Sequence, residues 1–241
     1  MAIRANAGTY AQYVTTSPTG DFTAMMWVYI VATTSTYTGL IYFGDNADYL
    51  APEYFGLDAD GLTPTFSRNV SGITASTPLT AATWYHLACS GNTGSTQQHT
   101  IYQDGVQVAQ GDFGVSLYTT GQTSVGSAGG GDNSNTRFEA FKFWNRKLTL
   151  NEVVTERRYI RPVSLVSLWQ WAPFISSTQL GDFSGNARDF SAVGSLTTED
   201  GPPISWGPRQ TRWRTTRLRW GQNLESCPPR HLFSPLDVKG F

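Results

Sequence analysis

Acidic and amide side chains gather in short loops that could hold a hard metal ion. Calcium takes about six to eight oxygen ligands, several from backbone carbonyls and water, so short loops of Asp and Asn suffice. The same residues also make turns, because their side chains accept hydrogen bonds from nearby backbone N–H groups. We favour the turn interpretation, most clearly for Asp58–Gly61, and keep calcium binding as the alternative. The ligands would then be Asp45, Asp48, Asp132, Asn133 and Asn135.

Glu139 is a carboxylate without a catalytic partner in its own strand. Retaining glycosidases use two carboxylates about 5 Å apart, but the positions two residues from Glu139 are Arg137 and Phe141. The chain also contains no G-x-S-x-G, H-E-x-x-H or phosphate-binding motif, and His86 and His99 are expected to be structural. We therefore predict no catalytic residue and no enzyme activity. A glycoside hydrolase with atypical carboxylates, including Glu139, is the alternative.

Tyrosines in or near loops could bind carbohydrate, because an exposed aromatic ring can stack on a sugar while neighbouring Asp or Asn side chains bind its hydroxyls. Most aromatic residues of a β protein belong to its core, so a core position is the alternative for each. The candidates are Tyr37, Tyr49, Tyr54 and Tyr118.

The C-terminal segment combines basic and aromatic residues. Residues 205–241 hold seven Lys and Arg against two Asp and Glu, so they carry about +5 while residues 1–204 carry about −6. Arg and Trp are enriched at the centres of protein interfaces, so we expect an arm that binds other protein subunits. An intramolecular strand and a nucleic-acid contact are the weaker alternatives. The candidate contact residues are Arg212, Trp213, Arg214, Arg217, Arg219 and Trp220.

Composition and pattern indicate that β-strands position these residues. Aromatic residues make up 13% of the 241 residues and charged residues only 15%, which suits short strands and tight turns better than helices. The run 83–113 predicts three consecutive antiparallel strands. Its Asp104-Gly105 pair favours a type I′ turn, which needs positive φ at both central residues.

Two further strands and one helix are predicted with some detail. Phe22–Val31 is a short apolar run flanked by turn residues, so it should be a buried central strand. In Arg137–Trp144, strict alternation places Phe141 and Phe143 on one face, and Lys142, Phe138 and Trp144 on the other. Thr149 can cap a helix that ends at Glu156, with Glu152 completing a capping box.

Four pieces in this order resemble laminin G-like domains of the concanavalin A-like lectin/glucanase superfamily. They are FTAMMWVYI, TWYHLACSG, IYQDGVQVAQG and RFEAFKFWNRKLTLNEV. The resemblance covers roughly residues 5–158 and implies an all-β jelly-roll sandwich of two antiparallel sheets with one short helix. Such domains often hold calcium at one rim of the sandwich, whereas the Glu-x-Asp-x-Glu signature of the superfamily's glucanases is absent here.

The chain divides into three predicted parts: a sandwich over 1–161, a strap over 162–204 that wraps and completes it, and the basic arm over 205–241. We expect a non-catalytic structural or adhesion module, an accessory decoration or tail-appendage protein of a phage-like particle. A stand-alone carbohydrate-binding lectin is the alternative. No signal peptide or membrane span is evident, so we expect a soluble protein that is made without a signal peptide. We expect it to be virion-associated or extracellular in action. Cys89 and Cys227 are expected to be free thiols.

Overall fold

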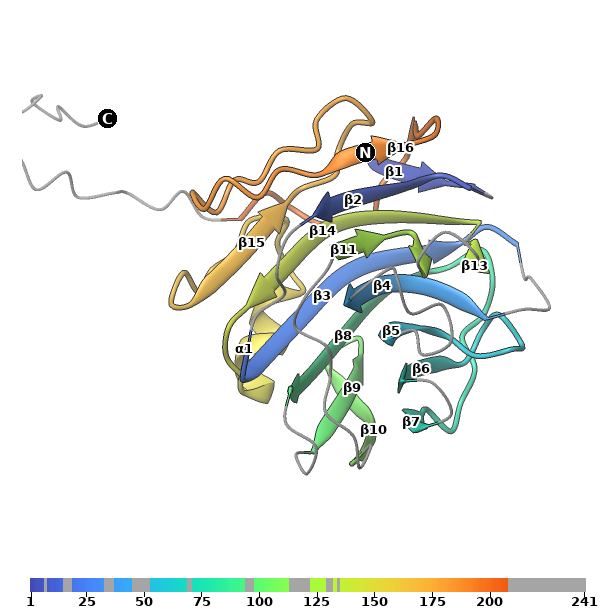
Figure 1. The fold of residues 1–241 in the computed structure, drawn as a ribbon, viewed down its shortest axis with the longest axis vertical. Helices are drawn as coiled ribbons and strands as arrows, with labels where there is room; N and C mark the ends of the chain where they lie inside the picture. Colours follow the sequence, from blue (N-terminus) through green and yellow to red (C-terminus); the bar gives the residue numbers. More distant parts are fainter. Residues whose placement is uncertain are drawn as a thin grey trace, which may run out of the picture. The chain divides into compact units, whose positions relative to one another are not determined.

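The computed structural model of the protein describes residues 1–6, 8–14, 19–32, 37–44, 53–68, 71–93, 98–112, 122–128, 132–133 and 135–207. They belong to one compact unit, Met1–Pro208. Within these residues the strands form two antiparallel sheets that pack face to face, as Figure 1 shows. The predicted all-β sandwich is confirmed.

The first sheet, sheet A, contains the longest strands. Its order is β10 (Val106–Gly111), β9 (His99–Gln103), β8 (Trp84–Asn92), β3 (Asp21–Ile30), β14 (Thr136–Trp144), β1 (Ala2–Ala5) and β17 (Thr197–Glu199), and β15 (Leu168–Ala172) pairs with β14 beyond the end of β1. The described part of sheet B has the order β16 (Ser191–Val193), β2 (Tyr10–Val14), β11 (Gln122–Val125), β4 (Thr38–Gly44), β5 (Glu53–Leu57), β6 (Pro64–Arg68) and β7 (Ser71–Thr74). A small hairpin joins β12 (Ser127–Ala128) to β13 (Asp132–Asn133).

The predicted central strand and meander are confirmed. β3 lies between β8 and β14, and its alternate residues from Phe22 to Ile30 enter the core between the sheets. Asp104 (φ 50°) and Gly105 (φ 80°) connect β9 to β10 with the positive backbone angles that a type I′ turn requires.

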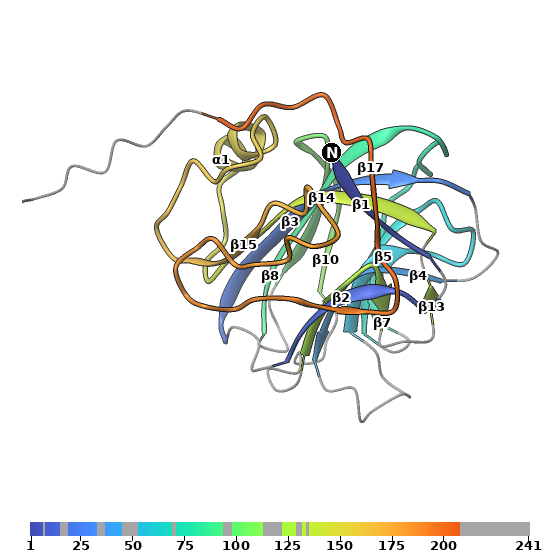
Figure 2. The same cartoon turned by 90° about the horizontal axis from the view of Figure 1, so that it is seen from above.

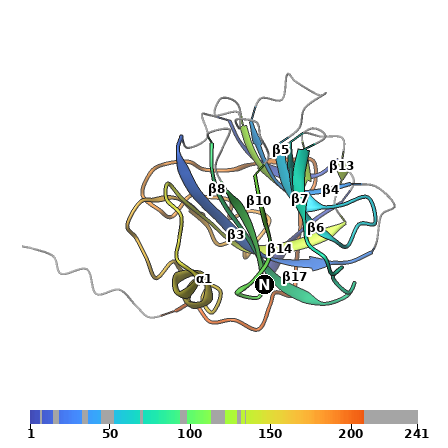
Figure 3. The ribbon, with the colours of Figure 1, turned by 90° about the horizontal axis from the view of Figure 1, so that it is seen from below.

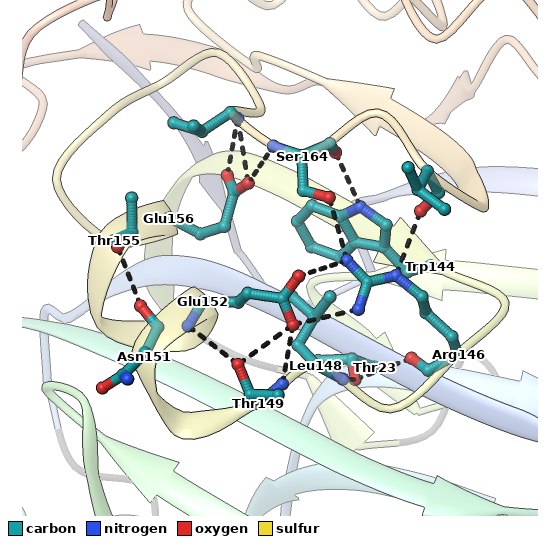
Figure 4. A network of polar contacts seen from close by, with 12 residues as sticks. Thr23, Trp144, Arg146, Leu148, Thr149, Asn151, Glu152, Thr155, Glu156 and Ser164 are labelled. Carbon is teal, nitrogen blue, oxygen red and sulfur yellow. Dashed lines mark hydrogen bonds and ion pairs between the residues drawn. The ribbon is translucent and has the colours of Figure 1, made fainter.

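The helix α1 (Leu150–Glu156) begins at the predicted capping box. Thr149 accepts a hydrogen bond from Glu152 N, and the Glu152 carboxylate accepts one from Thr149 N at 2.8 Å. Arg146 donates two hydrogen bonds to the same carboxylate and a third to Ser164 Oγ, which ties the helix to the following segment (Figure 4). These bonds hold the pKa of Glu152 down at about 2, against the opposing effect of burial.

The strap 162–204 adds strands to both sheets. β15 pairs with β14 and β17 with β1 in sheet A, whereas β16 pairs with β2 in sheet B. The Asp182 carboxylate accepts hydrogen bonds from the backbone N–H groups of Trp171, Ser184 and Arg188, so this acidic side chain closes a loop of the strap. The sandwich therefore extends well past residue 161.

Sheet A is covered on one half of its outer face, the face turned away from sheet B. There Val153 of α1 joins an apolar cluster whose other members are Met25, Ala88, Tyr102, Trp144 and Leu148. Figures 2 and 3 view the sandwich from opposite sides, and in both α1 and the N-terminus lie on the side opposite β4–β7. No helix in the described part of the chain is long and apolar enough to cross a membrane.

Candidate functional site

The other half of the outer face of sheet A carries a row of aromatic and basic side chains. The row consists of Trp84, Tyr29, Arg137 and Arg4, one residue from each of the adjacent strands β8, β3, β14 and β1. The register places each residue directly opposite the next, so the row crosses the strands at right angles. All four are half-buried. We call these four residues the outer row.

Side-chain contacts link three residues of the outer row directly, and Glu199 connects the fourth, Arg4, to Arg137. The rings of Trp84 and Tyr29 lie 5.4 Å apart, and the Arg137 guanidinium carbon lies 4.7 Å from the centre of the Tyr29 ring. Such a cation–π contact fixes the guanidinium over the ring. One face of the Tyr29 ring therefore lies under the guanidinium, and the row offers aromatic surface followed directly by hydrogen-bond donors.

Glu199 on β17, the edge strand of the sheet, contacts both arginines of the outer row. Its carboxylate lies 2.7 Å from Arg137 Nε and 3.0 Å from Arg4 Nη1. Arg4 also donates a hydrogen bond to Asn135 Oδ1 at 3.0 Å. One carboxylate thus pairs with two guanidinium groups, and such charge-assisted contacts hold the side chains together.

A hollow opens beside the charged end of the outer row. It has a volume of about 330 Å³ and is lined by Met1, Arg137, Thr198, Glu199 and Asp200. Polar residues therefore line most of it, including Arg137 of the outer row and its partner Glu199. This size and lining suit a small polar group with several hydroxyls.

Glu139 lies two residues after Arg137 on β14, close to Met1. Its side chain is 1% exposed, and Oε2 lies 3.7 Å from the Met1 amino group. Burial raises the pKa of this carboxyl to about 7, against the lowering effect of the amino group. Gly201 packs on it so closely that a Cβ there would collide with the carboxylate. This carboxylate is therefore shielded from a ligand on the outer face.

A β-bulge decides which residues of β14 reach the outer face. Between Glu139 and Lys142 the register with β3 shifts, and Ala140 adopts a left-handed φ of 56°. Phe138 therefore points into the core, whereas Arg137 and Glu139 point outward. The prediction that Phe138 shares a face with Lys142 is wrong for this reason. Because of the same bulge, strict alternation along β14 does not place Arg137 on the outer face.

The loop tyrosines take different positions. Tyr37 is 47% exposed and remains a candidate for stacking, with its ring 6.3 Å from that of Tyr54. Tyr54 is only 5% exposed and packs with Tyr42, so it offers no free ring face, and the alternative of a core position holds for it. Tyr49 and Tyr118 lie outside the described residues.

The acidic loops give little support for a metal site where they are described. The Asp60 carboxylate accepts hydrogen bonds from Leu62 N and Thr63 N, as the turn interpretation expects, and Asn135 is engaged by Arg4. Asp132 and Asn133 form β13, and Asp45 and Asp48 lie outside the described residues. Among the residues that the structure places, no group of three His, Cys, Asp or Glu side chains could hold a metal ion.

His86, His99 and Cys89 are buried in the sandwich. His86 packs against Trp27, and burial, with Lys142 and Arg157 nearby, holds the pKa of its ring well below the usual value. Burial raises the pKa of the Cys89 thiol, which is free as predicted. The six predicted partner-binding residues of the arm, Arg212 to Trp220, and Cys227 lie outside the described part of the chain.

Two antiparallel sheets packed face to face make the protein a lectin-like β-sandwich. The family model described as the concanavalin A-like lectin/glucanases superfamily matches residues 5–154, and the chain belongs to this laminin G-like family. The predicted resemblance is confirmed. No curated protein matches the chain.

Several solved structures are similar to this chain at low sequence identity. A protein from Bacteroides ovatus, named as a candidate carbohydrate-binding protein, is 16% identical to this chain, with a TM-score of 0.57. The match covers 84% of this chain and spans 62% of that protein's length. A heptameric SAP-like pentraxin from Limulus polyphemus is 16% identical with a TM-score of 0.48, covering 64% of this chain and 80% of its own. Domain 4 of a GH43 extracellular arabinanase from Geobacillus stearothermophilus, in complex with arabinotriose, is 16% identical with a TM-score of 0.44, covering 58% and 67%.

Proposed function

We propose that the protein is a non-catalytic carbohydrate-binding domain and that the outer row is its glycan-binding surface. The observation that carries the proposal is the unbroken contact from Trp84 through Tyr29 to Arg137. A sugar presents C–H groups on the faces of its ring and hydroxyls around its edge. Aromatic rings suit the faces, and the Arg137 and Glu199 side chains suit the hydroxyls.

The surroundings of the outer row support binding rather than hydrolysis. Glu199 is held by two guanidinium groups, and Glu139 is covered by Met1 and Gly201. Hydrolysis requires a carboxylate that can reach the glycosidic oxygen and another that can reach the anomeric carbon. A site that binds a glycan without cleaving it is what this arrangement favours.

A glycan array with the full chain tests this function. We expect Trp84→Ala and Tyr29→Ala to reduce binding about tenfold or more, since a lost stacking platform costs about 1–3 kcal/mol. Phe183→Ala is the control, because Phe183 is an exposed aromatic ring (48% exposed) on the strap, outside the outer row. Tyr37→Ala tests the loop alternative. Undiminished binding by both row variants, or loss of binding with Tyr37→Ala alone, would overturn the assignment.

We also propose that the arm 205–241 docks the domain on other protein subunits, in an accessory role on a phage-like particle. Support comes from its seven basic against two acidic residues and from its interleaved Arg and Trp. Replacing Arg212, Arg214, Arg217 and Arg219 by Gln should release the protein from the particle in negative-stain images of the native source. Native material that contains only free monomer would contradict this role.

A further inference from the structure

We propose that the glycan is an uncharged linear oligosaccharide that lies across the strands of sheet A, with its terminal unit in the hollow beside Arg137 and Glu199. This inference rests on the proposed function, because it names the ligand of the same surface. It follows from the length, the charge and the two unlike ends of the outer row.

The length of the outer row exceeds a single sugar ring. Trp84 and Arg4 stand on β8 and β1, with β3 and β14 between them. Neighbouring strands lie about 4.8 Å apart, so three spacings give a row of roughly 14 Å. Because its contacts are continuous, a chain of about three sugar units can touch the row throughout.

The charges around the outer row balance. Arg4 and Arg137 both contact Glu199, and Asp200 lines the same hollow. Two positive side chains therefore face two negative ones, and the buried Glu139 has the Met1 amino group beside it. No excess positive charge remains to attract an acidic sugar, so hydroxyls are the groups that this surface recognises.

The two ends of the outer row differ. At the Glu199 end, β17 is the edge of the sheet, and the hollow there is large enough for a terminal unit. At the Trp84 end, β9 pairs only with Leu87–Ser90 of β8, so Trp84 lies beyond the part of β8 that pairs with β9. A longer glycan can leave the row at Trp84, whereas the hollow receives a chain end.

Isothermal titration of the full chain tests the inference with neutral and acidic probes. Cello-, xylo- and malto-oligosaccharides of one to six units are compared with oligogalacturonates of the same lengths. We expect the affinity for one neutral series to rise at least about tenfold from one to three units and then to stay level. Trp84→Ala should abolish this gain while leaving the weaker binding of the shortest ligand.

Asp200→Asn is the matched probe of charge, because it removes one negative group from the hollow and leaves the aromatic rings in place. We expect this variant to gain affinity for oligogalacturonates by several-fold in low salt. A monosaccharide that binds as tightly as the trimer, or a wild-type preference for oligogalacturonates, would overturn the inference while the row's binding function stands. Absence of binding to every series, together with a silent glycan array, would overturn both.

Discussion

Arg137 Nε lies 2.7 Å from Glu199 Oε2, and this contact joins the body of the sandwich to its last described strand. Arg137 lies within residues 5–154, which the family model matches, whereas Glu199 comes more than forty residues later. The strap therefore does more than cover the sandwich. It supplies the carboxylate that orients both guanidinium groups of the outer row.

Glu199→Gln tests this role of the strap. We expect glycan affinity to fall about tenfold, because a neutral amide cannot hold both Arg4 and Arg137 in place, while the free energy of unfolding falls by about 1–2 kcal/mol. Titration calorimetry and urea denaturation measure the two effects. Glu152→Gln is the control, since its partner Arg146 lies beside α1: that variant should lose stability and keep its affinity.

Glu139→Gln should change how stability depends on pH. The folded protein holds the Glu139 proton up to about pH 7, whereas the unfolded chain releases it near 4.5. The folded state then binds more protons between these values, so this group makes the free energy of unfolding fall as pH rises from 4.5 to 7. The difference in free energy of unfolding, variant minus wild type, should therefore be larger above pH 7 than at pH 4.5 by up to about 3 kcal/mol.

Urea denaturation at pH 4.5, 6 and 7.5 provides this comparison for Glu139→Gln. A constant difference between the two proteins across this range would contradict the pKa shift. Buried polar surroundings would then stabilise the ionised carboxylate more than the contact with Met1 indicates.

Lys142→Met should destabilise the protein strongly. Lys142 Nζ lies 2.9 Å from Glu156 Oε2, with both side chains 1% exposed, and it also donates to the Tyr159 carbonyl. Removing the lysine leaves a buried carboxylate without its cation, which costs about 3–5 kcal/mol. Lys142→Met with Glu156→Gln should recover part of this loss in urea denaturation.

The more exposed pair of Arg146 and Glu152 is the control for that measurement. Arg146→Met should cost only about 1 kcal/mol, because solvent screens this pair and the helix keeps its capping box. Equal losses for Lys142→Met and Arg146→Met would contradict the difference that burial predicts.

Ala140→Gly should stabilise the protein by about 0.5–1 kcal/mol, because glycine adopts the left-handed φ of 56° without steric cost. Ala140→Val should destabilise it, since a β-branched side chain fits this conformation poorly. Thermal unfolding shows both effects. If the two variants change the midpoint temperature of unfolding in the same direction, the backbone at Ala140 is not under the conformational strain that its φ angle implies.

Local patterns in the sequence predicted much of the fold, because they depend on neighbouring residues alone. The short apolar run Phe22–Val31 between turn residues indicated the central strand, Asp104-Gly105 indicated the hairpin, and Thr149 with Glu152 indicated the start of α1. Each of these signals reflects backbone preference or side-chain periodicity within about ten residues. The order of the pieces then indicated the laminin G-like family, which the family match confirms.

Only the tertiary structure decided where the outer row lies. Trp84, Tyr29, Arg137, Arg4 and Glu199 come from five strands, and pairing between distant segments brings them together. The bulge at Ala140 then turns Arg137 outward, whereas strict alternation would have placed it on the core face with Phe141. A site built from strand register and one inserted residue has no local signal, because its members are neighbours in space and not in the chain.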